Sequence, residues 1–191
     1  MMKLLARAVL PLVAGAFLLA GCTSTQLGTA SPVKSDTAAP SSENPSSADP
    51  GSASTAALEP CTLLTAADVS GYASSFEPAE EKKLGGARIC RFQHKTASAT
   101  EEGMILSVAI RDNAPLDSVN DTGNGVKDLP VNGRPAKEAS SDAPLGCTVA
   151  LGVGDKSRVD VNATGLNTVD KACQIAEDMA TKIVEPKLPK G

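Results

Sequence analysis

Residues 147–163 read CTVALGVGDKSRVDVNA, and apolar side chains recur there at every second position on both sides of a polar turn. The members of this pattern are Cys147, Val149, Leu151 and Val153 before the turn and Val159, Val161 and Ala163 after it. Alternation with a period of two is typical of half-buried strands. The segment therefore predicts two strands joined by a turn near Gly154, Asp155 and Lys156.

Further strands are predicted upstream by the same period of two, in residues 88–95 and 104–111. The side chains that share a face are Cys90 and Phe92 in the first segment and Met104, Leu106, Val108 and Ile110 in the second. Asn132-Gly133 lies between short apolar segments and is a strong hairpin signal. Because proline lacks the amide that a sheet ladder needs, Pro130 and Pro135 favour an edge position for this hairpin.

A helical period appears near the C-terminus, where apolar side chains follow one another at spacings of three and four. They are Val169, Ala172, Cys173, Ala176, Met179, Ala180 and Ile183. This stripe predicts a helix with one core-facing side. Asn167 or Thr168 can cap its start, and Pro186 ends it.

A shorter helix is predicted upstream of the strands. Thr65 and Asp68 have the spacing of an approximate capping box, which predicts a helix from Ala66 to about Ala73. Glu77 to Lys83 is expected to be a loop. Together these elements predict an α+β fold, in which an antiparallel sheet of about five or six strands is packed by an N-terminal and a C-terminal helix.

The N-terminus carries the parts of an export signal. Lys3 and Arg7 precede an apolar run that ends in Leu19-Ala20-Gly21-Cys22. A basic head, a short apolar segment and small residues before a cleavage point are typical of a secretory signal peptide. The cysteine directly after them resembles a bacterial lipobox, in which the thiol of Cys22 carries a diacylglycerol and Cys22 becomes the first mature residue. About 13 apolar residues are too few to cross roughly 30 Å of hydrocarbon, which disfavours a transmembrane helix.

The chain of 191 residues divides into three predicted parts. Residues 1–21 are the signal peptide, and residues 22–59 form a Ser/Thr/Ala/Pro-rich tether, which we expect to be disordered because it cannot bury enough apolar surface. Residues 60–191 form one globular domain. Removal of the two basic residues of the signal lowers the net charge from -4 to -6. This acidic balance, without any basic run, argues against a nucleic-acid partner.

Four of the five cysteines lie in the predicted domain: Cys61, Cys90, Cys147 and Cys173. An even set in an exported chain predicts two disulfides, and four cysteines allow three pairings. Pairing of neighbours in the sequence closes the loops at the smallest entropic cost and ties each end helix to a strand. We therefore expect Cys61–Cys90 and Cys147–Cys173, with Cys61–Cys173 as the arrangement that would contradict this. The lack of any Cys-x-x-Cys motif disfavours a metal site.

Several short motifs resemble an uncharacterised family of actinobacterial secreted lipoproteins. They are Pro60-Cys61-Thr62-Leu63-Leu64-Thr65, Cys90-Arg91-Phe92, Cys147 at the start of a strand, and Cys173 in the terminal helix before Leu188-Pro189. Relatives commonly have Cys-x-Trp where this chain has Phe92. The resemblance covers about residues 60–189 together with the lipobox. It implies a secreted lipoprotein and no particular activity, because the family has no established catalytic residues.

Candidate catalytic groups are few. His94 is the only histidine, so any Ser-His-Asp or Cys-His mechanism must use it, and its place near the end of a strand favours an exposed or hairpin-end position over a catalytic one. Glu80-Glu81 and Glu101-Glu102 are adjacent carboxylate pairs. Glycosidase chemistry needs two carboxyl groups that face each other across a substrate, and adjacent residues point in different directions. We therefore expect both pairs to be solvated loop residues.

One polar loop holds side-chain oxygens that suit calcium: Asp117, Asn120, Asp121, Asn124 and Asp128. It lacks the glycine and the terminal glutamate of an EF-hand. An ordinary polar loop is therefore the favoured interpretation, and we expect neither a metal nor a cofactor.

These observations predict a protein that is lipid-anchored through Cys22 at the extracytoplasmic face of the cell membrane. We expect a non-catalytic module that binds an envelope ligand or protein, whose identity the sequence does not indicate. Its site is expected between the sheet and the C-terminal helix, or in the loop from Asp112 to Gly125. Two alternatives remain open: an envelope-acting hydrolase or transferase that uses His94 or the loop carboxylates, and an accessory structural subunit of a membrane assembly.

Overall fold

The structure is a computed structural model that describes residues 53–190. The predicted signal peptide, the lipidation site Cys22 and most of the tether lie outside the described residues. The part of the tether that is described, residues 53–59, packs on the domain: Thr55 is buried, and its hydroxyl donates to Asp112 Oδ1 at 2.7 Å. Ala53 and Leu58 also pack against the core. The folded part therefore begins before Pro60, because these side chains find buried partners.

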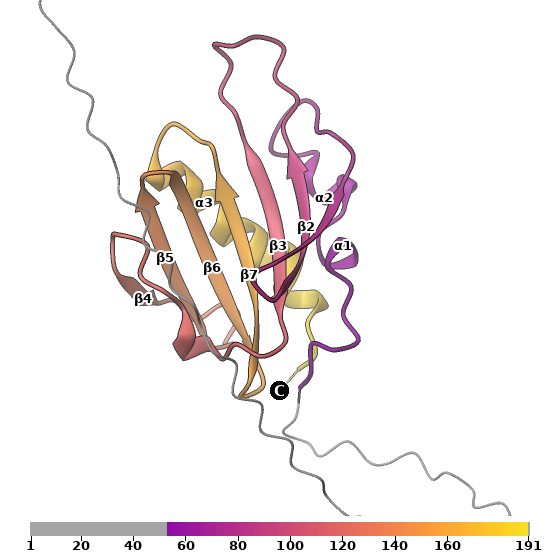
Figure 1. Cartoon of the computed structure of the whole chain (residues 1–191), viewed down its shortest axis with the longest axis vertical. Helices are drawn as coiled ribbons and strands as arrows, with labels where there is room; N and C mark the ends of the chain where they lie inside the picture. The colour runs from indigo at the N-terminus through magenta and orange to yellow at the C-terminus, as the bar shows by residue number, and fades with distance from the viewer. Residues whose placement is uncertain (1–52, 191) are drawn as a thin grey trace, which may run out of the picture. The chain divides into compact units, whose positions relative to one another are not determined.

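Seven antiparallel strands form one sheet in the order β1-β2-β3-β7-β6-β5-β4. The strands are β1 (Glu80–Leu84), β2 (Ala87–Gln93), β3 (Ile105–Arg111), β4 (Val126–Asp128), β5 (Ala136–Asp142), β6 (Leu145–Val153) and β7 (Ser157–Thr164). Figure 1 shows β7, late in the chain, lying beside β3. The α+β class and the antiparallel sheet are as the sequence predicts.

The sheet has more strands than the expected five or six because β1 and β4 are added at its two edges. All side chains of β1 and β4 are exposed, so neither strand carries the alternation that marks the inner strands. The segment that forms β1 was expected to be a loop, and that expectation is wrong. Charged side chains on an edge strand hinder pairing with another chain, and four of the five residues of β1, EEKKL, are charged.

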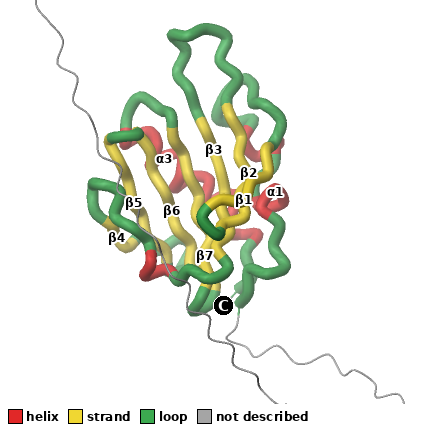
Figure 2. The backbone as a smooth tube through the Cα atoms, in the orientation of Figure 1, coloured by secondary structure: helices red, strands yellow, loops and turns green. Residues whose placement is uncertain are grey.

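The helices pack on one face of the sheet. They are α1 (Pro60–Leu63), α2 (Ala66–Val69) and α3 (Val169–Met179), and the chain continues through η2 (Ala180–Val184) and η3 (Glu185–Lys187). Figure 2 shows the helices and the sheet separately by colour. The predicted capping box is present between Thr65 and Asp68, but α2 ends at Val69, four residues before the predicted end. No helix among the described residues is long and apolar enough to cross a membrane.

Both disulfides have the predicted pairing. Cys61 in α1 is bonded to Cys90 in β2, and Cys147 in β6 is bonded to Cys173 in α3. Cys90 and Cys147 point to the same face of the sheet, because the strand registers place them in neighbouring rows of buried side chains. One disulfide therefore fastens each end helix to the same core.

The buried face is built in cross-strand rows. One row runs from Cys90 through Val108, Val161 and Val149 and ends at Glu138 in β5. The valines of this row are fully buried, and Glu138 is only 8% exposed. The register thus brings a carboxyl group to the rim of an apolar core.

The hairpin predicted at Asn132-Gly133 is also present. Both residues have positive φ, 50° and 84°, and Val131 and Arg134 pair across them. Two consecutive left-handed residues are the requirement of a type I′ turn, which explains why Asn-Gly is the preferred sequence there.

Replacement of leucine by alanine should have different effects in the core and on the surface of the domain. Leu106→Ala should lower the free energy of unfolding by about 2–5 kcal/mol, because Leu106 is fully buried in the inner strand β3 and its removal leaves a cavity. Leu84→Ala is the matched control and should change it by less than about 0.5 kcal/mol, because Leu84 is 71% exposed. Urea unfolding measures both, and equal losses would contradict the packing.

Candidate functional site

The structure buries His94 at the end of β2 instead of exposing it. The residue is 8% exposed, and its ring lies 5.9 Å from that of Phe76. Its Nδ1 lies 3.2 Å from the carbonyl oxygen of Glu102, and its Nε2 lies 3.7 Å from Glu101 Oε1 without a hydrogen-bond partner. His94 lies at the strand end, as the sequence predicts, but the alternative of an exposed side chain is wrong, because the Glu101 and Phe76 segments cover the ring.

The two carboxylate pairs occupy separate places and contact different partners. Glu102 accepts a hydrogen bond from the backbone amide of Asn167 at 2.7 Å and forms an ion pair with Lys171, so it fastens the β2–β3 loop to the start of α3. Glu80 in β1 pairs with Arg91 at 3.0 Å. Within neither pair do the two carboxyl groups face each other across a cleft lined by both.

The polar loop that was weighed as a calcium site, and interpreted as an ordinary loop, holds its carboxylates in separate contacts. Asp128 and Asp117 lie near Lys137, at 2.8 and 3.7 Å, whereas Asp121 Oδ1 accepts hydrogen bonds from the amides of Gly123 and Gly125. These carboxylates neutralise a lysine and form a turn instead of converging on one point.

Two of the surface hollows bear on function, and the larger, about 850 Å³, lies between the Asn132 hairpin, the β6–β7 turn and η3. Its side chains Arg134, Asn132 and Glu185 are already engaged with the protein. Arg134 donates to Glu185 and to the carbonyl oxygens of Gly152 and Pro189, and Asn132 donates to Glu185 and to a carbonyl of η2. These contacts fasten the C-terminal segment to the sheet.

The smaller hollow, about 670 Å³, is a cleft between the β4–β5 edge and the first half of α3. Its location matches the first of the two places where the sequence analysis expected a binding site. The side chains that matter for its chemistry are Lys127, Glu138, Asp170, Cys173, Gln174 and Glu177. We call this hollow the α3–β5 cleft.

Glu138 is the buried acid of this cleft. It lies opposite Val149 on the inward face of β5, so the sheet directs it toward α3. Its carboxyl group lies close enough to that of Glu177 in α3 for a hydrogen bond when one of them is protonated, and Lys127 Nζ lies 3.6 Å from its Oε1. The cleft thus contains two carboxyl groups in contact, with one lysine beside them.

Burial, followed by the hydrogen bond and the negative charge of Glu138, raises the pKa of the Glu177 carboxyl group, and Lys127 opposes this only in part. Two carboxyl groups in contact cannot both ionise without repulsion. The Glu177 carboxyl group therefore keeps its proton to a higher pH than an isolated glutamate. A carboxylic acid in such a place can donate that proton, or exchange it for a cation.

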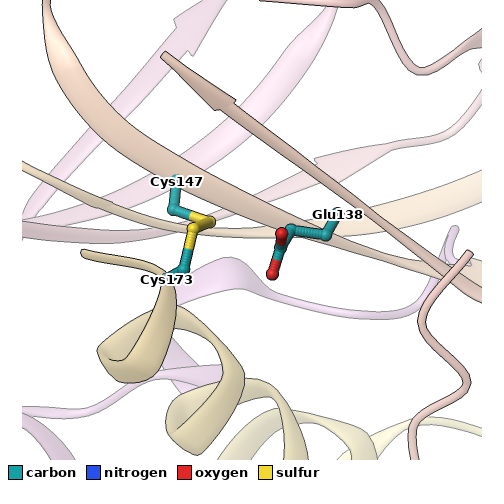
Figure 3. A group of neighbouring side chains, drawn as sticks. All are labelled: Glu138, Cys147 and Cys173. Atoms are coloured by element: carbon teal, nitrogen blue, oxygen red, sulfur yellow. A yellow bond between two sulfur atoms is a disulfide. The ribbon is translucent and has the colours of Figure 1, made fainter. Parts of the chain in front are cut away.

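The Cys147–Cys173 disulfide adjoins the same pair. A carboxyl oxygen of Glu138 and both sulfur atoms lie within 4.8 Å of one another. Figure 3 shows Glu138 reaching from its strand to the side of the disulfide, which joins α3 to the sheet. Because both sulfurs are bonded to each other, these three residues form no metal site in the oxidised chain.

Sequence reasoning did not identify Glu138 or Glu177. Two signals were available in the chain. Glu138 lies between Ala136 and Ser140 at the spacing that a strand places on one face, and Glu177 lies four residues after Cys173, on the same side of a helix. What the sequence could not supply was the contact between β5 and α3.

A comparison with protein-family models matches residues 17–186 to a family described as a protein of unknown function, DUF3558. No curated protein and no solved structure matches the chain.

The acid pair predicts how stability depends on pH. Because the folded-state pKa of Glu177 is raised, its contribution is fully present below the unfolded-state value and is lost as the pH rises through the folded-state value. Glu177→Gln should therefore stabilise the protein at pH 7 and lose this advantage near pH 4, where unfolded glutamate is also protonated (ordinary pKa about 4.3).

Urea unfolding at the two pH values measures this effect. Glu81→Gln is the matched control, because Glu81 is exposed on the β1 edge, and it should give no pH-dependent gain. Destabilisation by Glu177→Gln at pH 7 would show that the pair is not repulsive.

Proposed function

The chain belongs to this family of proteins of unknown function, and we propose that it is a lipid-anchored extracytoplasmic binding module of the cell envelope. The anchor is the diacylglycerol on Cys22, and the α3–β5 cleft is the binding site. In this role the domain recognises a ligand and catalyses no reaction.

The anchor is supported by the N-terminal sequence. The basic head, the short apolar run and Leu19-Ala20-Gly21-Cys22 together match an exported lipoprotein signal. Two acyl chains hold a protein at a membrane far more firmly than one, because each buried methylene contributes about 0.8 kcal/mol. The two disulfides fit the same location, since disulfides persist in oxidising extracytoplasmic compartments.

The single observation that carries the binding role is the difference between the two hollows. The larger hollow is lined by Arg134 and Asn132, whose donors already bond to the protein. In the α3–β5 cleft, the carboxyl groups of Glu138 and Glu177 lie close together and the pKa of Glu177 is raised, so a ligand's cation placed there would relieve their repulsion. Asp170 and Gln174 make no side-chain hydrogen bond within the part of the chain that the structure describes. Unengaged polar groups around a cavity are what recognition of a polar ligand needs.

The chemistry of the cleft favours a polar ligand with an ammonium group. A cation placed between the two carboxyl groups would replace the proton of Glu177 and remove their repulsion. Gln174 and Asp170 would supply hydrogen bonds to hydroxyl or amide groups. An amino sugar or a lysine-bearing peptide has this combination.

A second candidate function is supported by His94. Its Nε2 lies 3.7 Å from the Glu101 carboxylate and has no hydrogen-bond partner, so the two side chains that an envelope-acting hydrolase or transferase would use are neighbours. We rank this function below binding because His94 is buried and its Nδ1 contacts a backbone carbonyl. Turnover of an envelope compound that His94→Ala abolishes, with the fold intact, would place it first.

The anchor is tested by Cys22→Ser in the full chain. The unchanged chain should partition into the detergent phase in a phase-separation assay, and the variant should stay in the aqueous phase after removal of the signal, because it cannot accept the diacylglycerol. Cys61→Ser is the matched control and should leave the partition unchanged. Retention of the processed Cys22→Ser protein in the detergent phase would refute the lipid anchor.

The binding site is tested by a thermal-shift titration with amine-bearing envelope glycans and lysine peptides, each beside its N-acetylated form. The amine form should raise the unfolding midpoint, and Glu177→Gln should weaken its binding by about tenfold or more, since a hydrogen bond to a charged group is worth about 1.5–3 kcal/mol. Asp117→Asn, in the larger hollow, should have no effect. Equal shifts with acetylated ligands would contradict the role of the acid pair.

A further inference from the structure

The two disulfides of the domain differ in their surroundings. The bond between Cys61 and Cys90 packs against the core, where Cys90 is fully buried and its sulfur lies 3.8 Å from the carbonyl oxygen of Leu64. Among the described residues, no histidine or carboxylate side chain lies within 4.8 Å of both of its sulfur atoms.

Each disulfide joins a half-buried cysteine to a buried one, and the second differs in where its half-buried member lies. Cys173 lines the α3–β5 cleft, and its partner Cys147 is only 2% exposed. A small thiol that enters the cleft therefore meets the sulfur of Cys173 first. The sulfur of Cys147 is the one that would leave, into a nearly dry site.

The leaving sulfur has an acid beside it. The Glu138 carboxyl group lies within 4.8 Å of both sulfur atoms (Figure 3). Beside it lies Glu177, whose carboxyl pKa is raised by burial and by Glu138. A thiolate expelled into a buried site is a poor leaving group unless it is stabilised or protonated, and the rate of exchange depends on this. A carboxylic acid within reach of that sulfur supplies the proton.

We infer that the Cys147–Cys173 disulfide is a thiol–disulfide exchange site, which reacts with small dithiols through the α3–β5 cleft and uses Glu138 as the proton donor to Cys147. Glu177 acts through Glu138 and is a positioning residue. The inference does not require that the cleft binds the ligand proposed above, because it depends on the disulfide and on the acid beside it.

The reaction balances with a dithiol as the reductant. Its thiolate, formed by loss of one proton to solvent, attacks Sγ of Cys173; a new S–S bond forms and the Cys147–Cys173 bond breaks. The electron pair of that bond leaves on Cys147, which takes the proton of the Glu138–Glu177 pair.

The second thiol then attacks the mixed disulfide and gives its proton back to the acid pair. Cys173 leaves as a thiolate and takes a proton from solvent. The dithiol is oxidised to a disulfide, and the chain gains two electrons and two protons.

The test measures the reduction rate of each disulfide in the same molecule. The full chain carrying Cys22→Ser is treated with dithiothreitol at fixed pH, quenched with acid and alkylated, and the labelled cysteine peptides are quantified by mass spectrometry. Cys147–Cys173 should open at least about tenfold faster than Cys61–Cys90, and Glu138→Gln should slow it by about tenfold or more, toward the range typical of general acid catalysis.

Charge alone predicts the opposite result for Glu138→Gln. Removal of a negative charge near an attacking thiolate would speed the reduction, so a faster reaction in this variant would overturn the inference. Asp117→Asn, which removes an exposed carboxylate in the larger hollow, is the matched control and should leave the rate within about twofold of the unchanged protein.

The rate at Cys61–Cys90 reports on folding within the same experiment, because partial unfolding would open that buried bond faster as well. A variant in which this rate is unchanged is folded and gives a valid comparison. Equal rates at the two disulfides of the unsubstituted protein would overturn the inference, whatever the ligand titration shows.

Discussion

The pairing of β3 with β7 is the contact on which the rest of the domain depends. It joins the antiparallel strands β1–β3 to the antiparallel strands β4–β7, and it runs over the whole length of β3, from Ile105 to Arg111. Its register places Val108 opposite Val161 and Leu106 opposite Ala163, so the apolar faces of the two halves become one surface. A slip of one residue would turn one of these faces to solvent, because the side-chain period of a strand is two.

This one surface explains why both end helices pack on the same side. Cys90 belongs to the first half of the sheet and Cys147 to the second, and the shared register points both toward the helices. The chain ends are then drawn together: Lys187 donates to Asp68 at 2.9 Å, and Tyr72 donates to Asp178 at 2.7 Å. With one tyrosine and few phenylalanines, the domain gains little area from aromatic side chains, and the two disulfides and these polar links restrain the helices in their place.

The same register also places Glu138 beside Glu177 at the rim of the apolar core. The row that begins at Cys90 and continues through three buried valines ends at Glu138, where the sheet directs a carboxyl group toward α3. A buried carboxyl group without a partner is destabilising, and here Glu177 and Lys127 accompany it. Groups held in this way are often functional, and this is the reason that both of our proposals use the same cleft.

Local patterns in the sequence were enough to predict the strands β2, β3, β6 and β7, the stripe of α3, the capping box at Thr65 and the turn at Asn132-Gly133, because each depends on neighbours within a few residues. The disulfide pairing followed from the same local patterns together with the short loops between the cysteines. The edge strand β1 was not predictable in this way, since an exposed strand paired on one side needs no apolar period. Only the tertiary structure decided two other features. His94 is buried because the β2–β3 loop folds over its ring. Glu138 contacts Glu177 because the sheet packs against α3.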